Sequence, residues 1–206
     1  MKLLVVLMCV FSLHAQALFT GTTGGKNNGA VLLFGTGQRT GNAYSANNWG
    51  MVTYGATNHL DLFVGAGDMV ASGQHFPFMA FGNELAFPTA KILHCDIAVY
   101  NVFSFPFANM ERSATAFGNS GVIASKTFPL GKFPLTPYSG YILNYGLGPE
   151  DRTMAMPDII RQIPLGIAFP FGTKSPVGFM AEYDYGRMQG IGVALTYNFH
   201  WLQKIN

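Results

Sequence analysis

Apolar side chains alternate with small or polar ones in ten stretches of about ten residues, spread from about residue 30 to residue 201. The clearest stretch is 190–201, where one face would carry Ile191, Val193, Leu195, Tyr197, Phe199 and Trp201. Successive side chains of a β-strand point to opposite faces, so strict alternation predicts strands. The chain is therefore predicted to be all-β.

The ten stretches predict strands at 30–38, 49–56, 60–68, 78–87, 92–103, 113–126, 137–147, 163–171, 177–185 and 190–201. Long connectors, at 39–48, 69–77 and 148–161, alternate with short turns. This asymmetry predicts an antiparallel up-and-down barrel whose two termini lie on the short-turn side. Ten strands are expected, with eight as the alternative, because alternation is weakest in 113–126.

The second face of these strands is mostly Gly, Ala, Ser, Thr and Asn, and charged residues make up only 11% of the chain. An ordinary soluble domain has about 25%, and the solvent-facing side of a soluble sheet carries most of them. Hydrophobic residues make up 49%, yet no long apolar run follows residue 17. A transmembrane β-barrel fits this combination, because closure leaves no backbone group unpaired in lipid. A soluble sandwich buried on both faces is the alternative.

The first 17 residues have the pattern of a secretory signal peptide. Lys2 precedes an apolar run that ends at Leu13, and Ala15 and Ala17 form a small-residue cleavage site. We expect a signal peptide over 1–17 and one barrel domain over 18–206, exported by the general secretory route. Cys95 would then be the single cysteine, which excludes an intramolecular disulfide.

Aromatic residues gather near the ends of the predicted strands, as they do in the interfacial girdles of membrane barrels. The expected outer girdle contains Trp49, Phe76, Phe78, Phe103, Phe105 and Phe107, and the inner girdle Phe87, Phe128, Phe133, Phe171 and Trp201.

The hairpin 54–62 and the final strand 190–201 resemble those of the small outer-membrane β-barrel proteins of Gram-negative bacteria. The resemblance implies a location in the cell outer membrane, contact with outer-membrane lipid, and recognition of the C-terminal strand by the barrel-insertion machinery. In that family the last strand commonly ends the chain with an aromatic residue. Here 202–206 follow Trp201, which departs from the pattern.

Acidic residues within the predicted strands have the parity opposite to the apolar face, which places them in the barrel lumen. They are Asp61, Glu84, Asp96, Glu182 and Asp184. Polar lumen candidates are His59, His94 and Tyr100. The repeated His-x-Asp pattern would set two side chains about 6 to 7 Å apart, too far for a direct hydrogen bond. Lumen hydrogen bonding is therefore expected of these pairs, and catalysis is not.

No Gly-x-Ser-x-Gly, His-Glu-x-x-His, Walker or paired-cysteine motif is present in the sequence. We expect no enzyme activity, no cofactor and no metal, and the formal net charge of +2 without a basic cluster argues against nucleic acid. A face rich in Gly and Ala would fill a lumen poorly, which favours a narrow porin-like conduit for small solutes or cations. The alternatives are a non-conducting structural or loop-binding (adhesin-like) barrel and, third, an outer-membrane hydrolase.

Overall fold

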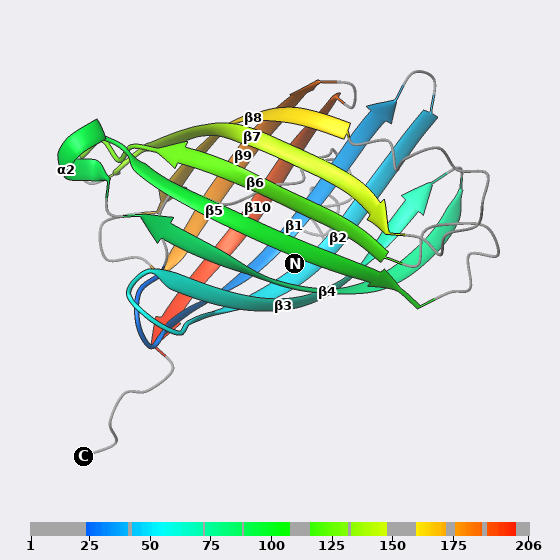
Figure 1. The fold of residues 1–206 in the computed structure, drawn as a ribbon, viewed down its shortest axis with the longest axis horizontal. Helices are drawn as coiled ribbons and strands as arrows, with labels where there is room; N and C mark the ends of the chain where they lie inside the picture. Colours follow the sequence, from blue (N-terminus) through cyan, green and yellow to red (C-terminus); the bar gives the residue numbers. More distant parts are fainter. Residues whose placement is uncertain are drawn as a thin grey trace, which may run out of the picture.

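In the computed structural model the strands form one closed antiparallel barrel, in the order β1-β10-β9-β8-β7-β6-β5-β4-β3-β2 (Figure 1). The strands are β1 (Asn28–Thr40), β2 (Ala43–Gly55), β3 (Leu60–Ala71), β4 (Gln74–Phe87), β5 (Asp96–Pro106), β6 (Ala116–Ser125), β7 (Thr136–Leu147), β8 (Ile160–Pro170), β9 (Val177–Gly186) and β10 (Gln189–His200). All ten predicted strands are present in the predicted order, and the alternative of eight strands is wrong.

The structure describes residues 24–40, 43–71, 73–87, 89–107, 116–131, 133–147, 160–171, 176–186 and 189–200. The predicted signal peptide at 1–17, Trp201 and the segment 202–206 lie outside these ranges. The one helix within them is α2 (Ala90–Leu93). No helix among the described residues is long and apolar enough to cross a membrane.

Closure depends on β1, which pairs with β2 on one side and with β10 on the other. Leu32, for example, lies opposite Met51 of β2 and Thr196 of β10. The start of β1 and the last residues of β10 therefore lie at the same end of the barrel, which we call the termini end; the opposite end is the far end.

The predicted alternation of long and short connectors is wrong. At the far end β1 and β2 are separated only by 41–42, β3 and β4 by 72–73, and β9 and β10 by 187–188, while 107–115 and 148–159 are longer. At the termini end the connectors are 56–59, 88–95, 126–135 and 171–176. Most of the polar segments 39–48 and 69–77 are strand, because ladder hydrogen bonds join backbone groups and do not require apolar side chains.

The outward face is the predicted apolar face. Leu62, Val64, Leu165 and Ile167 are between 41% and 54% exposed, although they lie within strands. The paired register gives four further apolar side chains the same outward parity; they are Ile97, Val99, Val193 and Leu195. Trp49 and Phe78 are corrections to the expected girdle, because their rings pack inside the barrel against Phe34 and against each other.

The interior is packed by aromatic rings that lie over glycines of the neighbouring strand. Tyr138 is paired with Gly166, Tyr100 with Gly121 and Phe63 with Gly82. A Cβ atom added to any of these glycines would lie 2.1 to 2.7 Å from the paired ring. These glycines therefore make room for rings, which fill part of the lumen that a glycine-rich face was expected to leave poorly filled.

We expect Gly166→Ala to destabilise the barrel by about 1 to 3 kcal/mol, as overpacking of a filled interior does. The added methyl would meet the Tyr138 ring, which is only 4% exposed and has little space to move. Unfolding by urea in lipid vesicles measures the loss.

The control is Tyr138→Leu, which removes the ring. In the double variant the Gly166→Ala loss should shrink, since the two changes share one contact. Strictly additive losses would show that ring-on-glycine packing does not limit this site.

Candidate functional site

Four carboxylates lie inside the barrel. Asp61 of β3 and Glu84 of β4 are 6% and 5% exposed, and Glu182 and Asp184 of β9 are 2% and 0% exposed. Asp96 opens β5 and is only half-buried. Asp96 is thus less buried than the other four acidic candidates.

The predicted histidine candidates do not reach the lumen. His59 lies in the 56–59 connector and His94 follows α2 with a φ of 56°, and both side chains are exposed. Residues 92–95, where strand was expected, belong to α2 and the bend that follows it, so His94 and Asp96 do not share one strand face. Neither His-x-Asp pair is therefore held as a pair in the lumen.

Two tyrosines and two carboxylates are buried in the barrel interior and influence one another electrostatically. The Tyr100 hydroxyl of β5 interacts electrostatically with Glu182 and Asp184 of β9, and Tyr138 of β7 interacts with the same two carboxylates. Because β5 and β9 are not neighbours in the sheet, this electrostatic interaction acts through the interior. Tyr100 and Asp184 are each 0% exposed, so solvent reaches neither side chain.

A ladder of amides fills the interior nearer the far end. The side-chain amide of Asn119 in β6 donates to Asn144 Oδ1 in β7 at 2.8 Å. The side-chain amide of Asn144 donates in turn to Gln162 Oε1 in β8. Gln162 is 1% exposed. Three adjacent strands thus contribute hydrogen-bonded side chains between the tyrosine level and the far end.

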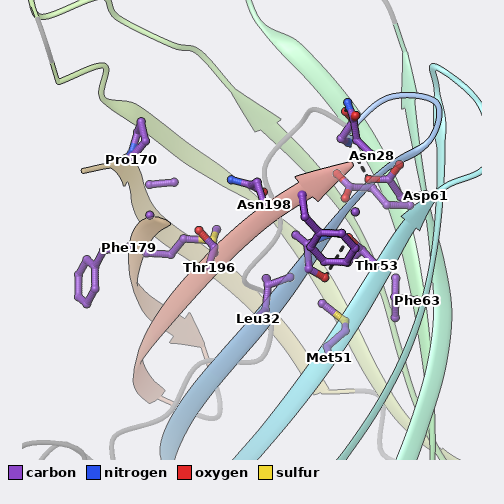
Figure 2. Close-up of a pocket in the computed structure, with 18 of the residues that line it drawn as sticks. Asn28, Leu32, Met51, Thr53, Asp61, Phe63, Pro170, Phe179, Thr196 and Asn198 are labelled. Carbon is purple, nitrogen blue, oxygen red and sulfur yellow. Dashed lines mark hydrogen bonds between the residues drawn. The ribbon is translucent and has the colours of Figure 1, made fainter. Parts of the chain in front are cut away.

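A cavity of about 520 Å³ occupies the termini end of the lumen. Its walls include Leu32, Met51, Phe63 and Met180, and its rim includes Asn198, which is exposed to solvent. Figure 2 shows side chains of β1, β2, β3 and β10 converging on it. The cavity is therefore a pocket that starts at the termini end and stops below the tyrosine level.

Asp61 and Glu84 line this cavity and are direct neighbours in the β3–β4 register. The backbone N–H of Gly24 donates to Asp61 Oδ2 at 2.7 Å. Asp61 Oδ1 and Glu84 Oε1 are buried and accept no hydrogen bond from any described residue. The cavity thus presents two unpaired carboxylate oxygens.

Tyr138, Gln162 and the two asparagines of the amide ladder were not singled out from the sequence. Their inward parity could be read there, but their partners lie on other strands, and only the register joins them. No group of three or more His, Cys, Asp or Glu side chains suited to a metal ion occurs in the described part of the chain.

Comparisons with known proteins assign no family. No protein-family model matches the chain, and no curated protein matches it. Among solved structures it resembles a designed protein described as "De novo design of transmembrane beta-barrels", at 13% identity and a TM-score of 0.40. The match covers 86% of this chain and 99% of the designed one. The chain is a ten-stranded antiparallel closed barrel of no assigned family.

Proposed function

We propose that this barrel is an integral protein of the Gram-negative outer membrane, exported by the general secretory route. Its outward face supports this. Leu33, Val64, Phe81 and Val122 are among the large apolar side chains on it that are 47% to 54% exposed. In water an apolar surface of this extent would drive association, whereas lipid solvates it.

The charged side chains of the strands fit the same proposal. Those that face outward in the described strands are Arg39, Asp68 and Arg161, and all three lie close to the far end. The apolar band between the two ends carries no charge in the described strands. Aromatic side chains flank it, with Tyr44 and Phe105 toward the far end and Phe87 toward the termini end.

Of the functional classes, we infer that a non-conducting barrel is the best supported. The single observation that carries this inference is the burial of Tyr100, Tyr138, Glu182 and Asp184 in the lumen, where these side chains are 0% to 4% exposed. A porin-like conduit for small solutes or cations would require these side chains to move. The barrel would then act by stabilising the envelope or by presenting its connectors to a partner.

We expect Val64→Arg to cost about 2 to 4 kcal/mol of folding free energy in a bilayer, because a guanidinium facing lipid near mid-depth loses its hydration. Val64 lies in the middle of β3 and is 54% exposed. Urea unfolding in vesicles measures the cost. Val64→Leu is the matched control and should stay within about 1 kcal/mol of the native chain. Equal stability of all three proteins would contradict lipid contact at this face.

In planar bilayers the native barrel should give no single-channel steps, whereas the double variant Tyr100→Ala, Tyr138→Ala should conduct. The opened lumen would retain Glu84, Glu182 and Asp184, so it should prefer cations, since fixed acidic groups focus the field in a narrow path. That preference should weaken near 1 M salt, where the screening length is about 3 Å.

The control for this experiment is Tyr141→Ala, which removes an outward-facing tyrosine that is 45% exposed and should leave the native barrel silent. Glu182→Gln in the opened background should reduce the cation preference. Steady conductance by the native chain would favour the conduit, and silence of the opened variant would show that the two tyrosines do not block the path.

Orientation is testable in intact cells that carry Cys95→Ser. With the termini in the periplasm, a cysteine introduced at His75 near the far end should react with a membrane-impermeant maleimide. A cysteine introduced at Ile92 in α2, which is 79% exposed at the termini end, should react only after the outer membrane is permeabilised. Reaction at Ile92→Cys alone in intact cells would reverse the proposed orientation.

A further inference from the structure

The termini-end cavity contains a feature that the proposed function leaves unused. Glu84 lines the cavity, and only 5% of its surface is exposed. Its Oε1 atom has no hydrogen-bond partner among the described residues. Asp61, its neighbour in the register, contributes a second unpaired oxygen, Oδ1. A buried carboxylate oxygen without a partner is costly, so two of them facing one pocket call for a ligand that supplies donors.

The ligand should be cationic. No Lys, Arg or His is among the described residues that line the cavity, so none of them offsets the two acidic groups. Hydrogen bonds from a cation to a carboxylate are shorter and about twice as strong as neutral ones. An ammonium group carries three N–H donors, enough for Asp61 Oδ1, Glu84 Oε1 and one more acceptor.

The ligand should also have an apolar body. A volume of about 520 Å³ lies in the range of small-molecule pockets, about 300 to 1,000 Å³, and greatly exceeds the space of a bare ion. The walls beside the carboxylates are the apolar side chains of Leu32, Met51 and Met180. Calcium takes six to eight oxygen ligands, and the described residues hold no group of three acidic, histidine or cysteine side chains suited to a metal ion.

We propose that the termini-end cavity binds a small organic ammonium ion, with the charged group at Asp61 and Glu84 and the apolar body against Leu32, Met51 and Met180. The site lies inside the barrel and stops below the tyrosine level. It therefore does not depend on whether the barrel is conducting or silent. Binding would be reached from the termini end, which the proposed orientation places in the periplasm.

The test uses the refolded full-length barrel with ¹³C-methyl methionine, titrated with benzylammonium chloride at neutral pH. Met51 and Met180 line the cavity, whereas Met79 is 43% exposed on the outward face and reports contact through the detergent. We expect saturable shifts of the Met51 and Met180 methyl signals without a matching shift at Met79. Benzyl alcohol, which has the same body without the charge, should bind at least tenfold more weakly.

Two variants assign the charged group. Glu84→Gln and Asp61→Asn keep the shape of each side chain and should each weaken benzylammonium binding by about tenfold to a hundredfold. Glu182→Gln is the matched control, because Glu182 is also buried but is not among the residues that line the cavity. The affinity of this variant for benzylammonium should stay within about threefold of the native value.

Three results would overturn the proposal. The first is the absence of a saturable shift at Met51 and Met180. The second is equal binding of benzylammonium and benzyl alcohol, or unchanged binding by Glu84→Gln. Either result would show that apolar contacts, and not the carboxylates, hold the ligand. The third is displacement of benzylammonium by an equal concentration of calcium chloride, which would indicate a metal site.

Discussion

The pairing of β1 with β10 is the interaction on which the rest of this structure depends. An open sheet would leave one edge of β1 and one of β10 with unpaired N–H and C=O groups, and each such group costs several kcal/mol in lipid. Closure joins Asn28 through Arg39 to the last strand residue by residue. Once the sheet is closed, each side chain faces either the lumen or the surroundings, and the division into an apolar outside and a mixed inside follows.

The lumen of a ten-stranded barrel must still be filled, and paired glycines and aromatic rings fill it. A glycine opposite Tyr138 or Tyr100 lets the ring lie across the neighbouring strand instead of standing into open space. The tyrosines of β5 and β7 then interact electrostatically with the carboxylates of β9. Small residues that faced each other would leave a barrel empty. Here they face aromatic rings, and the rings occupy the interior.

The two ends of the lumen differ as a result. Toward the far end, amides of β6, β7 and β8 satisfy one another in a ladder. Toward the termini end a cavity remains, with Phe63, Asp61 and Glu84 in its wall. Asp61 Oδ1 and Glu84 Oε1 accept no hydrogen bond from a described residue, which costs stability, and a bound donor would offset that cost. The unequal filling is thus the physical basis for a pocket open at one end.

Much of this protein could be read from the order of its residues. Period-two alternation determined ten strands and their outward face, and parity alone placed Asp61, Glu84, Glu182 and Asp184 inside, because a strand side chain has only two directions. Connector lengths could not be read, since the polar residues of 39–48 and 69–77 are as able to pair as apolar ones. Parity also placed Tyr100 in the lumen, but His94 and Trp49 could not be placed. Whether a glycine marks a gap or the seat of a ring, and which carboxylate lacks a partner, depends on the residue opposite. That neighbour is far away in sequence, and only the closed register brings it into contact.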